Sequence, residues 1–248
     1  MKFLCLHGYT QNASLFAKKA SGLRKLLKKN GHELVFIDGP VKIEPKDLPF
    51  EPSQELLDTD MRGWFCIDSN DPETYGNTAR AFEAVKAAVE AEGPFDGLIG
   101  FSQGAGLAAI LTKALPQIAP SNPALKIAIL YSAFRLEAPS AQHWYETPFT
   151  TPTLHVMGTL DTVVPEERGM ILYNCWAPTA RQVLKHPGGH YTPSQKPILQ
   201  AVLAFVNDVI EGKYGGDAEA GANAETEAKP EQGKGKEDWS EFDNIGKN

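Results

Sequence analysis

The sequence predicts an α/β protein in which a mostly parallel, doubly wound sheet of about six strands is flanked by helices. Short apolar runs alternate with longer segments of helical periodicity, as in a sheet whose parallel strands are joined by helices. One run, residues 126–132, is almost entirely apolar, which is typical of a strand buried on both faces. A Gly-x-Ser-x-Gly motif at residues 100–104 lies between a predicted strand and a predicted helix.

The predicted strands are short apolar runs that end in loops rich in glycine, histidine or acidic residues. They comprise residues 2–6, 33–37, 98–101, 126–132, 153–157 and 182–185. The loops after the first, third, fifth and last of these runs carry His7, Ser102, Asp161 and His190. Because ligands bind at the carboxyl ends of parallel strands, we expect these four residues at one edge of the sheet.

The predicted helices repeat an apolar residue every three or four positions and end at glycine or proline signals. They comprise residues 14–30, 78–91, 105–116, 166–176 and 194–211.

Two irregular segments, residues 39–75 and 134–151, interrupt the alternation of strands and helices. Long irregular segments in a compact domain are often functional. Their aromatic residues are therefore candidates for lining a substrate pocket, namely Trp64, Phe65, Phe134 and Trp144. For Trp64 and Phe65 an alternative remains open, in which the two rings pin a long loop to the core.

The length of 248 residues fits one α/β domain, predicted at residues 1–212, followed by an acidic tail at 213–248. The tail contains few apolar residues and is predicted to be disordered. It carries 5 lysines and 9 acidic residues, and so accounts for −4 of the net charge of −7. No basic region indicates nucleic-acid binding.

Targeting signals are not evident in the sequence. Only four apolar residues follow Lys2 before His7, whereas a signal peptide needs roughly 7–15. No stretch approaches the roughly 18 apolar residues of a membrane span. The three cysteines lack metal-type spacing and are expected to be thiols in a reducing compartment. We therefore expect a cytoplasmic protein.

Ser102 is the candidate nucleophile. A serine on a strained strand-to-helix turn holds its hydroxyl clear of the sheet, and Gly100 and Gly104 leave room for the crowded backbone. The backbone N–H of Gln103 would point to the position of an oxyanion, at a helix N-terminus that favours negative charge. The alternative is a serine that serves only as a turn residue.

A nucleophilic serine needs a general base and an acid that orients the base. In this strand–turn–helix context the chain order is serine, acid, histidine. The order favours Asp161, which follows a strand end, and His190, which follows the last strand. His186 is the alternative base. Of the other histidines after Ser102, His143 precedes the acid-bearing strand, and His155 lies inside that strand as a predicted core residue.

The loop after the first strand is expected to supply a second oxyanion donor. The candidate is the backbone N–H of Tyr9, whose ring would lie near the acyl group. His7 is interpreted as a structural residue that braces this loop.

Four motifs in this order resemble the fungal family of small serine hydrolases related to the human ovarian-tumour-associated hydrolase. They are LCLHGYTQN, GPFDGLIGFSQGA, GTLDTVVP and HPGGHYTP, and the resemblance runs over residues 2–210. It implies an α/β-hydrolase fold and a catalytic triad carried here by Ser102, Asp161 and His190. It also implies carboxylesterase or thioesterase activity on a small-molecule ester or thioester, without a cofactor or a metal.

Two alternative functions remain open. Acyl-protein thioesterases also carry the Gly-Phe-Ser-Gln-Gly sequence, and would prefer acylated peptides to small esters. A hydrolase fold can instead serve as a binding module, in which case Ser102 would be inert.

Overall fold

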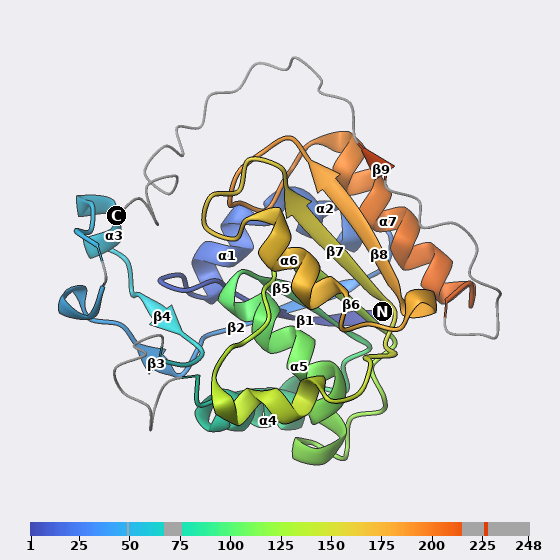
Figure 1. Cartoon of the computed structure of the whole chain (residues 1–248), viewed down its shortest axis with the longest axis horizontal. Coiled ribbons are helices and arrows are strands. Elements are labelled where there is room, and N and C mark those ends of the chain that lie inside the picture. Colours follow the sequence, from blue (N-terminus) through green and yellow to red (C-terminus); the bar gives the residue numbers. More distant parts are fainter. Residues whose placement is uncertain (49, 67–75, 215–225, 228–248) are drawn as a thin grey trace.

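The structure is a computed structural model that describes residues 1–48, 50–66, 76–214 and 226–227. Its main sheet contains seven parallel strands in the order β2-β1-β5-β6-β7-β8-β9 (Figure 1). The strands are β1 (Lys2–Leu6), β2 (Glu33–Ile37), β5 (Gly97–Phe101), β6 (Ile127–Tyr131), β7 (Thr153–Gly158), β8 (Arg181–His186) and β9 (Thr226–Glu227). The predicted parallel sheet of about six strands is confirmed, and the two-residue β9 extends it at one edge.

Helices cover both faces of the sheet (Figure 1). They are α1 (Ala13–Lys19), α2 (Ser21–Lys29), α4 (Ala79–Glu92), α5 (Gln103–Ile118), α6 (Glu166–Tyr173) and α7 (Lys196–Ile210). Side chains alternate along β1, so that Phe3 and Cys5 join an apolar cluster with α1, α2 and α7. Leu4 and Leu6 point to the opposite face and join the cluster with α4, α5 and α6. The predicted doubly wound arrangement is thereby confirmed.

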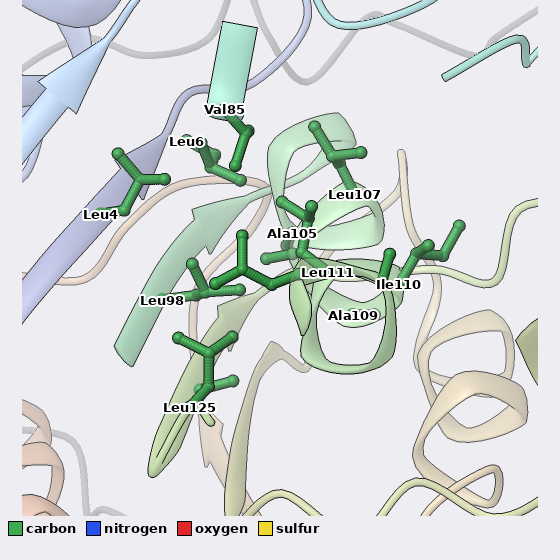
Figure 2. Close-up of a cluster of buried hydrophobic side chains, with 14 of the residues drawn as sticks. Leu4, Leu6, Val85, Leu98, Ala105, Leu107, Ala109, Ile110, Leu111 and Leu125 are labelled. Carbon is green, nitrogen blue, oxygen red and sulfur yellow. The ribbon is translucent and has the colours of Figure 1, made fainter. Parts of the chain in front are cut away.

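The core beneath the Gly-x-Ser-x-Gly motif is formed by β1, β5, α4 and α5. Figure 2 shows Leu4 and Leu6 of β1 facing Leu98 of β5 and the apolar side chains of α5, with Val85 of α4 beside them. All of these side chains are buried. A rigid, buried base therefore carries the turn that follows β5.

The strand order reverses between β1 and β5. From β1 the chain continues to β2 on one side, whereas β5 pairs with β1 on the other side, with Leu6 opposite Gly100. The loops that follow β1 and β5 consequently leave the sheet as neighbours. A reversal of this kind is where an open α/β sheet binds its ligand, at the carboxyl ends of the strands.

The helix predicted at residues 14–30 is two helices in the structure. Ala20 ends α1 and begins α2, and its backbone at φ −88°, ψ 19° departs from helical geometry. Helix α2 then lies close to α7, since a Cβ atom on Gly22 would come within 3.3 Å of both Leu199 and Ser194. Apolar periodicity continued across the break and therefore concealed it.

The segment at residues 39–75 is more regular than expected. The described part contains β3 (Val41–Lys42) and β4 (Arg62–Gly63), which form a separate antiparallel pair. A 3₁₀ turn (Pro45–Asp47) and the short helix α3 (Gln54–Leu57) lie between them. The remaining 3₁₀ turns are Pro139–Tyr145, within the second irregular segment, and Pro178–Ala180.

Most of the predicted tail, residues 215–225 and 228–248, lies outside the described residues, so the domain boundary and the disorder stay predictions. Its beginning is in contact with the domain, because the ring of Tyr214 lies 5.0 Å from that of Phe205. Thr226–Glu227 pair with β8. Among the described helices, none has the length and apolar character that crossing a bilayer requires.

Candidate active site

Ser102 lies at the sharp turn between β5 and α5. Its backbone, at φ 51° and ψ −117°, is in a region that non-glycine residues rarely occupy. The two motif glycines permit this turn. A Cβ atom on Gly100 would lie 2.5 Å from Cα of Ala105, and one on Gly104 would lie 2.3 Å from the carbonyl oxygen of Leu6. The spacing of the motif is thus a steric requirement of the turn.

The structure brings Ser102, His190 and Asp161 together, although 88 positions separate the first pair and 29 the second. Oγ of Ser102 lies 2.9 Å from Nε2 of His190, and Nδ1 of His190 lies 2.8 Å from Oδ2 of Asp161. A carboxylate can only accept, so Nδ1 carries the proton and Nε2 accepts from the serine hydroxyl. The side chains of His190 and Asp161 are only 7% and 1% exposed, which excludes water from the bond between them.

Asp161 is held as an anion. Burial raises the pKa of its carboxyl, but the hydrogen bond and charge of His190, the N–H of Val164 and the Ser132 hydroxyl outweigh burial and lower the pKa. Oδ1 accepts from the N–H groups of Val163 at 3.0 Å and Val164 at 2.8 Å. The carboxylate therefore has a fixed orientation and keeps its charge at neutral pH.

The candidate oxyanion donors lie on the two loops that leave the sheet beside each other. Gln103 is the first residue of α5, so its N–H has no acceptor within the helix. Across the described ranges, neither this N–H nor that of Tyr9 donates a hydrogen bond. The arrangement leaves two amide protons available near Ser102, one of them at the positive end of a 16-residue helix.

His7 and Trp64 fix the loop that follows β1. His7 donates from Nδ1 to the carbonyl of Gly8 at 2.8 Å and accepts from the N–H of Gly39 at Nε2, also at 2.8 Å. Burial lowers the pKa of His7 to about 4, so the ring stays neutral. Nε1 of Trp64 donates to the carbonyl oxygen of His7 at 2.7 Å. These bonds support the interpretation of His7 as a brace.

The side chain of Gln103 has a role that sequence reasoning missed. Its Oε1 accepts from the N–H of Trp64 at 2.8 Å, and its Nε2 donates to the carbonyl of Phe65 at 3.0 Å. The first residue of the nucleophile helix thereby anchors the 39–75 segment. The sequence signal was a glutamine directly after Ser102, whose side chain can both donate and accept hydrogen bonds. Its partners Trp64 and Phe65 lie 39 and 38 positions away, so the sequence did not identify them.

The four aromatic candidates for pocket lining differ in burial. Trp64 has no exposed surface and Phe65 is 5% exposed, so both face the interior, beneath the nucleophile turn. Phe134 and Trp144 are half-buried. The rings of Trp144 and Phe82 lie 6.2 Å apart, edge to face. Of these four side chains, only Phe134 and Trp144 are not fully buried, so the lining of a pocket by any of the four stays a prediction.

The other histidines lie away from the Ser102 hydroxyl. His186 is buried, its ring packs edge-on against Tyr191 at 5.4 Å, and burial lowers its pKa to about 4. His155 is enclosed in β7 between Tyr173 and Trp176. His190, and not His186, is the histidine that contacts Ser102. Within the described residues, no cluster of three or more histidine, cysteine or acidic side chains could hold a metal ion.

Comparison with known proteins places this site in a family context. The family model described as "Serine hydrolase (FSH1)" matches residues 1–202. The chain is 36% identical to "Family of serine hydrolases 3" of Saccharomyces cerevisiae, over 84% of each chain. It is 40% identical to "Esterase OVCA2" of Danio rerio, over 83% of this chain and 96% of that one.

Solved structures share the fold at lower identity. Esterase PE8 superposes with a TM-score of 0.60 at 19% identity, covering 84% of this chain and 92% of its own. Acyl-protein thioesterase 2 of Zea mays gives a TM-score of 0.56 at 19% identity, covering 85% and 94%. The fold is that of the α/β-hydrolases, as the resemblance implied.

Proposed function

Because this chain belongs to the FSH1 family of serine hydrolases, we propose that it cleaves small-molecule carboxylic esters or thioesters through an acyl-enzyme on Ser102. The observation that carries the proposal is the pair of hydrogen bonds from His190, at 2.9 Å to Ser102 and at 2.8 Å to Asp161. A base within hydrogen-bond reach of the nucleophile and oriented by a buried acid is the arrangement that activates a serine.

In the acylation step, His190 takes the proton of Ser102 while Oγ attacks the ester or thioester carbonyl. The developing oxyanion accepts from the N–H groups of Tyr9 and Gln103, and Asp161 stabilises the imidazolium ion that forms. His190 then donates the proton to the leaving alcohol or thiol. In the second step His190 takes a proton from water, which attacks the acyl-enzyme; the bond to Oγ then breaks, His190 returns the proton to Ser102, and the carboxylic acid is released.

Labelling with a fluorophosphonate tests the activated nucleophile directly. We expect one covalent adduct on the parent protein and none on Ser102→Ala, because the probe reacts only with a serine whose proton a base can accept. Intact-mass spectrometry measures both outcomes.

The matched control is Ser194→Ala, which removes an exposed serine four positions after His190 and should label like the parent. A folded parent protein that takes no adduct would contradict the proposed function. In that case a hydrolase-fold binding module would be the better description.

The preferred substrate is tested by a series of p-nitrophenyl esters and acyl thioesters of increasing chain length. Turnover of small soluble members supports the proposed esterase or thioesterase. Preference for an S-acylated peptide over all of them would indicate an acyl-protein thioesterase instead.

The compartment we propose is the cytoplasm. Support comes from Cys5, Cys66 and Cys175, all of which are thiols in the structure. Cell fractionation followed by detection of the protein measures this; recovery from an oxidising compartment would contradict it.

A further inference from the structure

A pocket of about 240 Å³ lies between the segment that follows β6 and helix α6. Its lining residues are Arg135, Glu137, Gln142, Arg168 and Ile171. Ile171 is an exposed apolar side chain, and it gives the pocket one wall that suits methylene groups. The other four lining residues are polar or charged, and two of them are arginines.

Aromatic rings hold both guanidinium groups in place. Cζ of Arg135 lies 4.6 Å from the ring centroid of Tyr145, and Cζ of Arg168 lies 4.3 Å from that of Phe134. A hydrogen bond of 2.7 Å from Arg135 to Oε1 of Gln142 fixes the first group further. Stacking orients the plane of a guanidinium group and leaves N–H groups at its edge for an oxygen ligand.

The positive charge at the pocket is not fully compensated. In the part of the chain that the structure describes, neither Arg135 nor Arg168 forms an ion pair with a carboxylate. The lining contains one acidic residue, the exposed Glu137, against two arginines. Paired arginines bind carboxylate and phosphate oxygens through charge-assisted hydrogen bonds.

Short contacts connect this pocket to the nucleophile. The N–H of Gly106 donates to the carbonyl of Ser102 at 3.0 Å. A Cβ atom on Gly106 would lie 3.1 Å from the carbonyl oxygen of Phe134, whose ring in turn carries Arg168. A second connection runs through Asp161, because Val164 donates to its carboxylate and Arg168 lies four positions further along the chain.

We propose that this pocket binds an anionic oxygen group, a carboxylate or a phosphate, at the far end of the substrate whose carbonyl lies at Ser102. The proposal rests on the hydrolase function proposed above and names the substrate class. The substrate would be an ester or thioester whose acyl part or leaving group ends in such an anion.

Two substrate pairs test the preference for an anionic substrate. They also distinguish an anion on the acyl part from one on the leaving group. Mono-p-nitrophenyl adipate and p-nitrophenyl hexanoate differ by a terminal carboxylate on a six-carbon acyl chain. Hexanoyl-coenzyme A and hexanoyl-N-acetylcysteamine share the acyl chain and the thioester, and only the leaving group of the first carries phosphates, together with the rest of the pantetheine arm and adenosine. We expect the anionic member of at least one pair to have a kcat/KM about ten- to a hundredfold above its neutral partner.

Variants assign the preference to the pocket. Arg135→Gln and Arg168→Gln should each reduce the anionic-to-neutral ratio towards one, through a higher KM for the anionic member. Glu137→Gln should raise the ratio, an increase that a damaged fold would not produce. The control is Arg181→Gln, because Arg181 also stacks on a ring, that of Tyr173 at 4.4 Å, but does not line the pocket.

A binding measurement separates this inference from the hydrolase function. On the Ser102→Ala background, the dissociation constant of hexanoyl-coenzyme A or adipate monoester should rise about tenfold or more in Arg168→Gln. A ratio near one in the parent for both pairs, or a ratio that the arginine variants do not change, would overturn the pocket assignment. If no substrate is turned over, the hydrolase proposal fails, and the binding constants alone decide the pocket.

Discussion

At the scale of single residues, the surroundings of Asp161 decide whether His190 can act as a base. Ser132 lies next to this acid at the end of β6, and it adopts a left-handed backbone with φ 48°. Its buried hydroxyl makes no well-formed hydrogen bond among the described residues, yet it lowers the pKa of Asp161. Strain of this kind beside a reactive group indicates a position that contributes to the site.

Replacing Ser132 by glycine and by alanine separates the hydroxyl from the strain. Both changes remove the hydroxyl, raise the pKa of Asp161 and should lower kcat/KM about two- to tenfold. The acidic limb of the pH–rate profile should move to higher pH in both. Ser132→Gly should also have a higher melting temperature than Ser132→Ala, because glycine adopts a positive φ without strain whereas alanine keeps the strain of the native serine. Unchanged profiles in both variants would show that the hydroxyl does not influence Asp161.

At the scale of elements, helix α5 and the β3–β4 segment depend on each other through the side chain of Gln103. Two buried hydrogen bonds, to Trp64 and Phe65, join them at the base of the nucleophile turn. The bond from Trp64 to His7 continues this connection to the loop after β1. Three segments that are distant in sequence therefore hold the candidate oxyanion donors in register.

Gln103→Ala tests this connection. The change leaves the buried N–H of Trp64 and the buried carbonyl of Phe65 without hydrogen-bond partners. Each loss should lower the free energy of unfolding by about 1–3 kcal/mol. Urea unfolding measures the loss, and ester hydrolysis should fall with it because the loops shift.

Gln54→Ala is the control, since this exposed glutamine lies in the same segment and its side chain, within the described residues, bonds only to the exposed Asp58. Equal stabilities for the two variants would mean that the two bonds of Gln103 contribute nothing net.

At the scale of the whole molecule, three of the buried histidines make the fold sensitive to acid. Burial lowers the pKa of His7 and His186 to about 4 and that of His155 to about 3. In the unfolded chain each would titrate near 6.5. Between these values the unfolded state binds more protons, so the stability falls as the pH falls from about 6.5 towards about 4.

Each of these histidines should contribute about 1.4 kcal/mol per pH unit to this loss over the interval. Urea unfolding at pH 7.5, 6 and 5 measures it. His155→Leu should reduce the slope of the free energy of unfolding against pH by the contribution of one histidine. His143→Gln, which changes an exposed ring, should leave the slope unaltered. A parent protein equally stable at pH 7.5 and pH 5 would contradict the expected linkage.

Sequence alone was sufficient to predict the alternation of strands and helices, the turn at Ser102 and the proximity of Asp161 and His190 to that turn. These features depend on local periodicity, on local steric limits and on chain order, all of which are present in the linear sequence. The need for glycine at positions 100 and 104 could be predicted for the same reason, because the local geometry of the turn leaves no room for a side chain there.

Tertiary structure alone decided which distant groups meet. The break at Ala20, the β3–β4 pair and the bonds of Gln103 to Trp64 and Phe65 depend on packing between elements. So does the presence of Arg135 and Arg168 at one pocket, although the two residues are 33 positions apart in sequence. Contacts of this kind leave no periodic signal, because either residue alone is compatible with many surroundings. The position of a side chain among partners far along the chain is set only when the sheet and its helices have packed.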